Sequence, residues 1–225
     1  MAASNENSTL LLGDSNTKYV YLEGDSANPS GTGTKSTLGA NLPGKKIPTY
    51  HIRQIDPLKC LGYQNILLHV GINDFNPRSK GREVTDPAVD DVRAIFNNFA
   101  DKVDKIQAYC PYSKLIISPI LPTKMDVYNR RAKQFNKLLF DYVHQHNEIK
   151  VLDFNSFLDY SEKYLDNSFG SYLNPSDPIH LGRTGVQMLS FMFQGSILRN
   201  MGDGRSYSRM VTNRKYRSDY PPIVR

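Results

Sequence analysis

Three short segments of the chain combine residue types that could carry out nucleophilic chemistry. Gly13-Asp14-Ser15 supplies a hydroxyl, Gly71-Ile72-Asn73-Asp74 supplies a side-chain amide, and Asp177-Pro178-Ile179-His180 supplies a carboxylate and an imidazole. A serine hydroxyl becomes an effective nucleophile when an imidazole takes its proton and a carboxylate orients that imidazole. Each segment alone is also ordinary turn or helix-cap composition, so its meaning depends on where the fold places it.

Buried strands are predicted directly before two of these segments. The apolar run Ser8–Leu12 ends at Gly13, and the run Asn65–Val70 ends at Gly71. Further strands are predicted at Leu38–Leu42, Lys114–Ser118 and Ile149–Leu152.

Long helices are predicted between and after these strands. Apolar residues recur at spacings of three and four through Asp86–Cys110, which is typical of a helix with one buried face. Asp86 can accept hydrogen bonds from the first free amides of this helix, and Pro87 suits its first position. A second helix is predicted over Asp126–His146, and a last one follows Leu181.

The alternation of strands and helices predicts the fold class. It favours a single three-layer α/β/α domain with a five-stranded parallel sheet in the flavodoxin-like order 2-1-3-4-5. In such sheets ligands bind outside the carboxyl ends of the strands. Ser15 and Asn73 follow strands, and His180 directly precedes the last helix. We therefore expect the three segments to meet at one edge of the sheet.

In their order and spacing these segments resemble the motif blocks of the SGNH (GDSL-type) serine hydrolase family, over about residues 9–198. The resemblance implies that Ser15 is the nucleophile, His180 its general base and Asp177 the residue that orients the imidazole. It also implies an oxyanion hole made by the amide N–H of Ser15, the amide of a glycine in the second block, and the side chain of Asn73.

The glycine of the second block has two candidates. Gly44 lies between the predicted strand Leu38–Leu42 and a short helix predicted over Ile47–Ile55, in which Pro48 would occupy the first turn. That is the position that the family motif requires, so Gly44 is favoured. Gly39 lies in a similar glycine-containing stretch and is the competitor.

Two features add to the motif comparison. Asn16 follows the nucleophile where the family often has an aliphatic residue, so the packing of this turn could differ. Residues 24–37 are rich in Gly and Ser and are expected near the mouth of the site, either as a lid or without a role.

The other titratable residues near the motifs are expected to be structural. Asp14 and Asp74 are suited to accept hydrogen bonds from loop amides. His51 and His69 are interpreted as packing residues rather than as site residues.

Metal and disulfide chemistry find little support. His144 and His146 are two residues apart on a predicted helix and so face different ways, which argues against a zinc pair. Cys60 and Cys110 could pair, but two cysteines make no disulfide framework, and we interpret them as reduced, partly buried thiols. The resemblance implies a hydrolase that needs no cofactor.

The net charge of +6 belongs mainly to the C-terminal end of the chain. Residues 199–225 contain seven Lys/Arg and two Asp/Glu, which leaves about +1 for residues 1–198. We therefore expect a domain over 1–198 and a flexible basic tail over 199–225. Such a tail could contact nucleic acid or another acidic surface, or could simply be solvated.

The first residues of the chain and its hydropathy bear on the location of the protein. Residues 1–8 are polar and contain no apolar core, so no signal peptide is predicted. No run of about 18 apolar residues occurs, so no transmembrane segment is predicted. An intracellular, cytoplasmic protein is the expectation.

Two functions are compatible with these observations. The first is an esterase or deacylase that hydrolyses short acyl esters through a Ser15 acyl-enzyme, because no long apolar stretch is available to line a channel. The second is a weakly active or inactive SGNH domain that acts as a binding or assembly module, with the basic tail contacting nucleic acid. In its layout the chain also resembles SGNH domains of non-LTR retrotransposons and related mobile or viral elements.

Overall fold

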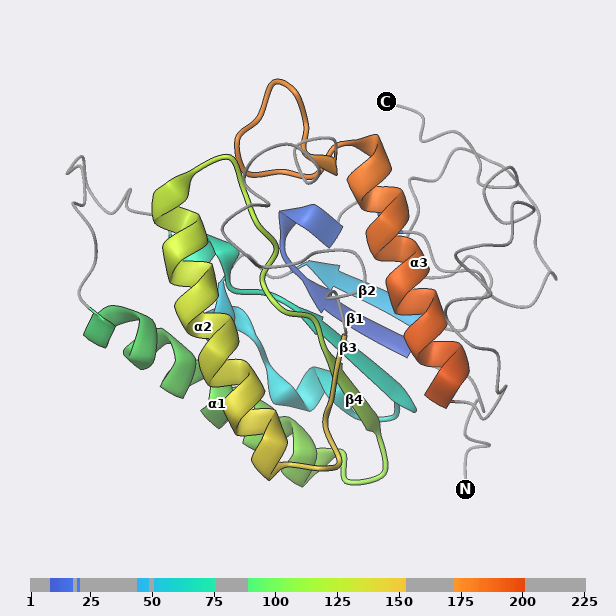
Figure 1. The fold of residues 1–225 in the computed structure, drawn as a ribbon. Helices are drawn as coiled ribbons and strands as arrows, with labels where there is room; N and C mark the ends of the chain where they lie inside the picture. The colour runs from blue at the N-terminus through green and yellow to red at the C-terminus, as the bar shows by residue number, and fades with distance from the viewer. Residues whose placement is uncertain are drawn as a thin grey trace, which may run out of the picture.

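The structure, a computed structural model, describes residues 9–17, 20, 44–48, 51–75, 89–152 and 172–200. Within these residues five parallel strands form one sheet, with helices on both of its faces (Figure 1). The strands are β1 (Thr9–Gly13), β2 (Gly44–Pro48), β3 (Asn65–His69), β4 (Lys114–Ile117) and β5 (Lys150–Val151). Their order is β2-β1-β3-β4-β5, so the predicted order 2-1-3-4-5 is confirmed.

Three long helices and four short 3₁₀ turns complete the described fold. The long helices are α1 (Val89–Tyr109), α2 (Asp126–Gln145) and α3 (Arg183–Asn200). The 3₁₀ turns are η1 (Ser15–Thr17), η2 (Ile52–Gln54), η3 (Pro57–Cys60) and η4 (Ile72–Phe75). All three long helices correspond to predicted ones, and the described part of α1 begins at Val89.

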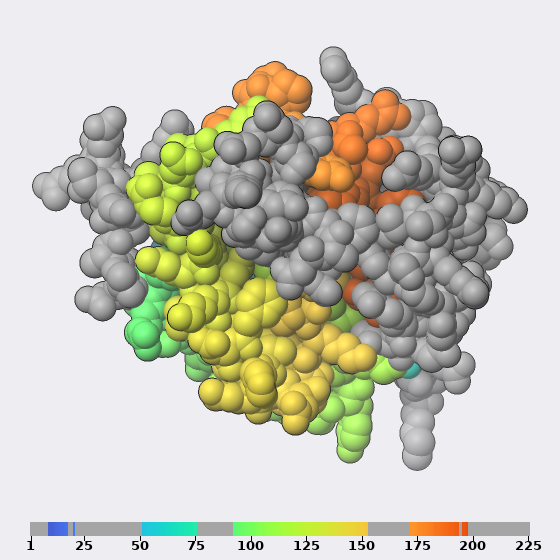
Figure 2. Space-filling model, viewed as in Figure 1, coloured from blue at the N-terminus to red at the C-terminus, as the bar shows by residue number. Residues whose placement is uncertain are grey.

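Alternation along β1 divides the core into two layers. Leu10 and Leu12 are buried with residues of α1 and α2, whereas Leu11 is buried with residues of α3. Successive side chains of a strand point to opposite faces, so a continuous apolar strand is buried on both sides. The sheet is therefore sandwiched between α1 and α2 on one face and α3 on the other (Figure 1). The surface of α2 forms much of the face seen in Figure 2.

The second strand is not where the sequence predicted it. Gly44–Pro48 forms β2, so the helix predicted over Ile47–Ile55 is wrong, and among the described residues of that range only η2 is helical. The strand predicted at Leu38–Leu42 lies outside the described residues. Two lysines and a proline in β2 hide the strand pattern, but such residues are tolerated in an edge strand, and among the described strands β2 lies at the edge of the sheet.

The ends of the domain and its cysteines complete the description. Helix α3 runs to Asn200, two residues past the predicted boundary, and residues 201–225 lie outside the described part, as do residues 24–37. Cys60 and Cys110 are both free and buried. None of the helices in the described ranges has the length and apolar character needed to cross a bilayer.

Candidate active site

Ser15 is held in a tight turn at the carboxyl end of β1. The N–H of Asp14 donates to the carbonyl of His69 at 2.9 Å, which extends the pairing of β1 with β3 past Gly13. The carbonyl of Asp14 then accepts two bonds from Thr17, from its N–H at 3.1 Å and from its hydroxyl at 2.8 Å. A Cβ on Gly13 would lie 1.9 Å from Oγ1 of Thr17, so this turn requires glycine there.

The segment that carries Asp177 and His180 forms a closed loop before α3. Leu173 and Leu181 form an isolated antiparallel bridge at its base, and the Asn174 N–H donates to the carbonyl of His180 at 2.9 Å. The loop reaches the molecular surface (Figure 2, orange). The side chain of His180 is 41% exposed, so the site is open to solvent.

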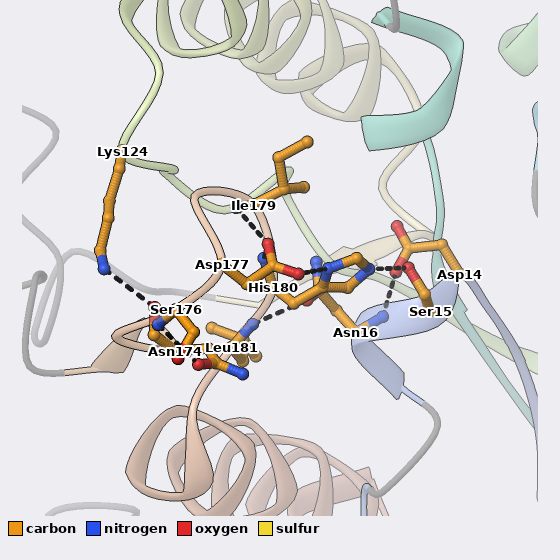
Figure 3. Close-up of polar contacts among 10 residues, drawn as sticks. All are labelled: Asp14, Ser15, Asn16, Lys124, Asn174, Ser176, Asp177, Ile179, His180 and Leu181. Carbon is orange, nitrogen blue, oxygen red and sulfur yellow. Dashed lines mark hydrogen bonds and ion pairs between the residues drawn. The ribbon is translucent and has the colours of Figure 1, made fainter.

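Ser15, His180 and Asp177 form one continuous hydrogen-bonded chain (Figure 3). Oγ of Ser15 lies 2.7 Å from Nε2 of His180, and Nδ1 of His180 lies 2.6 Å from Oδ2 of Asp177. An ionised carboxylate can only accept, so Nδ1 carries the imidazole proton. Nε2 therefore presents its lone pair to the Ser15 hydroxyl, which is the arrangement that general-base catalysis requires.

Asp177 is held in its ionised form by its own loop. Its Oδ1 accepts the N–H groups of Ile179 at 2.8 Å and His180 at 3.0 Å. Partial burial disfavours the charge, but these two amides and the imidazole outweigh it and hold the pKa of Asp177 below its ordinary value. The carboxylate thus stays negative at neutral pH, beside the ring that would become positive.

The side chains of Asn16 and Lys124 form hydrogen bonds to the backbone of this loop. Oδ1 of Asn16 accepts the N–H of Leu181 at 3.0 Å. Nζ of Lys124, in the connection between β4 and α2, donates to the carbonyls of Asn174 at 2.8 Å and Pro175 at 3.2 Å. Sequence reasoning noted Asn16 only as a departure from the motif and missed Lys124, which carries no local signal.

The segment Gly71–Asp74 follows β3, and η4 begins at its second residue, Ile72. Gly71 has φ of +128°, and a Cβ there would lie 2.6 Å from Cδ1 of Ile120, so no other residue fits without strain. Oδ2 of Asp74 accepts the N–H of Ile52 at 2.9 Å, which confirms the predicted structural role of Asp74. Burial raises the pKa of Asp74 despite this bond.

Asn73 and the Ser15 amide lie at the same edge of the sheet. Gly13 is paired with His69, and Ser15 and Asn73 follow these two partners. Among the described residues, neither the Ser15 N–H nor the Asn73 side chain has a hydrogen-bond partner. Within this part of the chain both groups therefore have hydrogen-bond donors available at this edge of the sheet.

Gly44 lies at the amino end of β2, whereas Ser15 and Asn73 lie at the carboxyl edge of the sheet. The prediction that Gly44 belongs to the oxyanion hole is therefore wrong. The register pairs Gly44 with Thr9 and Pro48 with Gly13. Four residues of strand separate Gly44 from the carboxyl edge, a distance of roughly 13 Å. The competitor Gly39 lies outside the described residues. After Pro48 the next glycine is Gly62, so no glycine directly follows β2.

Buried polar side chains lie next to the nucleophile turn: His69, Ser118 and Asp14. Nδ1 of His69 lies 2.7 Å from Oγ of Ser118, and burial lowers the pKa of His69 to about 4, so the ring is neutral at pH 7. Burial raises the pKa of Asp14 to about 7, while its Oδ1 accepts the N–H of Asn16 at 2.9 Å. The 3.9 Å approach of Asp14 to the neutral His69 is a packing contact rather than an ion pair. The predicted structural roles of Asp14 and His69 are confirmed.

The remaining histidines lie apart from this chain of contacts. His51 does not pack in the core: its side chain is partly exposed, and its Nδ1 lies 3.7 Å from Oδ1 of Asp74. His144 and His146 lie at the end of α2. Within the described ranges, no group of three or more His, Cys, Asp or Glu could hold a metal ion.

Solved structures share this fold. They include a member of the lipolytic protein G-D-S-L family from Veillonella parvula, with 15% identity, a TM-score of 0.54 and coverage of 85% of this chain and 98% of that one. A carbohydrate esterase family 3 protein from Talaromyces cellulolyticus has 14% identity and a TM-score of 0.57 over 88% and 100% of the two chains. The acetylxylan esterase Axe2 from Geobacillus stearothermophilus, as a catalytic mutant, has 13% identity and a TM-score of 0.56 over 92% and 98%.

The comparisons confirm the α/β fold predicted from the alternation of strands and helices. Structural neighbours of this chain are G-D-S-L lipolytic proteins and esterases, at low sequence identity. No protein-family profile and no curated protein matches the sequence.

Proposed function

We propose that this protein is a serine esterase or deacylase that hydrolyses ester bonds through a covalent Ser15 acyl-enzyme and needs no cofactor. The observation that carries the proposal is the unbroken chain from Oγ of Ser15 through His180 to Asp177, with links of 2.7 and 2.6 Å. These three hydrogen-bonded residues lie at the carboxyl edge of a parallel sheet, where ligands of this fold class bind.

Acylation would begin at the Ser15 hydroxyl. As Oγ attacks the ester carbon, its proton passes to Nε2 of His180, and the negative Asp177 stabilises the imidazolium that forms. When the tetrahedral intermediate collapses, the bond to the leaving oxygen breaks and His180 gives its proton to that oxygen. The products of this step are an alcohol and the Ser15 ester.

Deacylation would repeat the sequence with water. His180 takes a proton from a water molecule whose oxygen attacks the acyl carbon, and then returns the proton to Oγ of Ser15. The carboxylic acid leaves and the free hydroxyl is restored, so both steps balance without any other reactant.

The oxyanion would be stabilised by donors that make no hydrogen bond within the described part of the chain. We assign the N–H of Ser15 and the side-chain amide of Asn73 to this role, because both follow neighbouring strands at the same edge. Removal of one such donor typically lowers the rate about 10²- to 10³-fold. Asn73→Ala is expected to show a loss of this size in kcat.

Short acyl groups are the proposed substrates. The sequence offers no long apolar stretch to line an acyl channel. One structural neighbour is an acetylxylan esterase, which fits a small acyl group.

Two measurements test the function. A serine-directed phosphonate should label the folded protein at Ser15, and p-nitrophenyl esters should be hydrolysed fastest when the acyl chain is short. Ser15→Ala should lower kcat by about 10⁴- to 10⁶-fold. Absence of both labelling and turnover in correctly folded protein would refute the proposal, and a maximum at long chains would refute the preference for short acyl groups.

The basic C-terminal residues favour a second, compatible candidate: binding of nucleic acid or another polyanion. Residues 199–225 carry seven basic and two acidic side chains. Such binding should weaken steeply with salt and disappear when the chain is truncated near residue 200. Binding that is insensitive to both changes would exclude this role for the tail.

A further inference from the structure

We propose that Asn16 is a positioning residue: its bond to Leu181 holds the Asp177–His180 loop against the nucleophile turn, so that His180 stays in place to activate water after Ser15 is acylated. The inference rests on the serine hydrolase function proposed above. It gives a specific role to the residue that departs from the family motif.

The contact of Asn16 runs beside the contact of the reacting groups. Ser15 is bonded to His180, and their immediate successors Asn16 and Leu181 are bonded to each other, at 2.7 and 3.0 Å respectively (Figure 3). Both bonds join residues 165 positions apart in the chain. Two adjacent bonds between two consecutive pairs fix both the distance and the relative orientation of the segments.

Asn16 is built rigidly into the turn. Its side chain is buried, with 6% of the residue exposed, and its N–H donates to Oδ1 of Asp14 at 2.9 Å. Leu181 is likewise buried, at 8% exposed. The acceptor and donor are therefore shielded from water, where a hydrogen bond holds its geometry best.

The Asn16 bond is the one that can persist through the reaction. Among the hydrogen bonds of described residues 14–17, only those of Ser15 and Asn16 reach the loop 174–181. Once Ser15 is acylated, Oγ has no proton to donate, so the link to His180 is lost. The Asn16–Leu181 bond then remains to keep Nε2 of His180 facing the acyl carbon while water attacks.

This persistence separates a positioning role from a structural one. Loss of the Asn16 acceptor should slow the step in which His180 activates water more than the step in which Ser15 is modified. A misplacement of about 1 Å in such a geometry can cost about 10²-fold in rate. We therefore expect kcat for ester hydrolysis to fall more than the rate of phosphonate labelling at Ser15.

Four variants provide the test. Asn16→Leu has a similar size but no acceptor, and Asn16→Asp keeps an oxygen for the Leu181 N–H. Asn65→Leu is the matched control, because Asn65 is a buried asparagine at the amino end of β3, far from the carboxyl edge. Ser15→Ala reports on the proposed function itself.

Each variant would be assayed with p-nitrophenyl acetate at about pH 8, after circular dichroism shows it to be folded. We expect N16L to lose about 10² in kcat with a smaller loss in labelling, while N16D and N65L stay within about threefold of wild type. If N16L does not fold, Asn16→Ala should show the same split between kcat and labelling.

The possible outcomes are distinguishable. Wild-type kcat in N16L or N16A, or a loss in N16D as large as that in N16L, would overturn the inference and leave the hydrolase function standing. An equal fall in kcat and labelling would also overturn it, because the bond would then not act selectively after acylation. Full turnover by S15A would instead refute the proposed function.

Discussion

Asp177→Asn is the substitution whose effect the hydrogen bonds define most closely. The carboxylate accepts three bonds: Oδ1 takes the amides of Ile179 and His180, and Oδ2 takes the imidazole Nδ1–H. Asparagine has one side-chain oxygen. Placing that oxygen at Oδ1 keeps two bonds, whereas the flipped amide would face its NH₂ against two N–H donors.

The tautomer of His180 is therefore expected to reverse in D177N. The NH₂ of the introduced side chain would occupy the position 2.6 Å from Nδ1, so Nδ1 must accept and the proton must move to Nε2. A protonated Nε2 cannot take the Ser15 proton. Loss of the correct tautomer in a triad lowers kcat about 10⁴-fold.

The assay is kcat and KM for a p-nitrophenyl ester across pH, together with the thermal unfolding midpoint. The two amide bonds survive, so the fold and KM should change little while kcat falls. Asp56→Asn is the control, because Asp56 caps η3 by accepting the N–H of Leu58 at 3.1 Å in a similar local turn. A D177N enzyme within about tenfold of wild type would refute the tautomer reasoning.

The pH dependence of stability provides a second test of the same residue. The folded pKa of Asp177 is below its ordinary value, so its contribution to stability is present at neutral pH. This contribution is lost as the pH falls through the lowered folded pKa. D177N should therefore lose less stability than wild type on acidification, and an identical acid profile in the two proteins would contradict the direction of the shift.

Three further predictions concern the turn and the loop. Burial raises the pKa of Asp14 from 3.8 to about 7, so the ionised carboxylate lowers the stability of the folded protein increasingly as the pH rises through that window. Asp14→Asn should therefore raise the unfolding midpoint more at pH 8 than at pH 4. An equal change at the two pH values would contradict this. Gly13→Ala would place a methyl group 1.9 Å from the Thr17 hydroxyl. We expect destabilisation of about 1–3 kcal/mol in denaturant unfolding and loss of most esterase activity. A variant as stable and active as wild type would show that the turn adapts. Lys124→Met removes two hydrogen bonds from an exposed ammonium group to the carbonyls of Asn174 and Pro175. The free energy of unfolding should change by about 1 kcal/mol or less, while kcat falls several-fold. An unchanged kcat would show that the loop keeps its conformation without Lys124.

Much of the central fold was predictable from local pattern. Strands β1 and β3 each contain three consecutive apolar residues, and each has all of its residues buried. Helices α1 and α2 have apolar residues at helical spacing and bury that face against the sheet. Because both signals are properties of short stretches, the sequence alone predicted these elements. Their alternation along the chain then predicted a parallel sheet in the order 2-1-3-4-5. Ser15 follows a strand and His180 precedes the last helix, and these positions predicted that the two would lie at the same edge of the sheet.

Strand β2 was not predictable in this way, and the assignment of Gly44 failed with it. The segment Gly44–Pro48 has no strand pattern of its own and becomes a strand by pairing with β1 at the edge of the sheet. The observed strand begins six residues later than the predicted one, so Gly44 lies at the first position of β2 instead of after its carboxyl end. Register comes from long-range pairing, which a single sequence does not contain.

The contacts that grip the Asp177–His180 loop were decided by tertiary structure alone. Asn16 meets Leu181 across 165 residues, and Lys124 meets Asn174 across 50. The sequence determined which residue types were available for chemistry and on which edge they would gather. Only the folded chain determines which backbone groups lie within about 3 Å of which side chains, because hydrogen bonds depend on distances and angles that packing of distant segments sets.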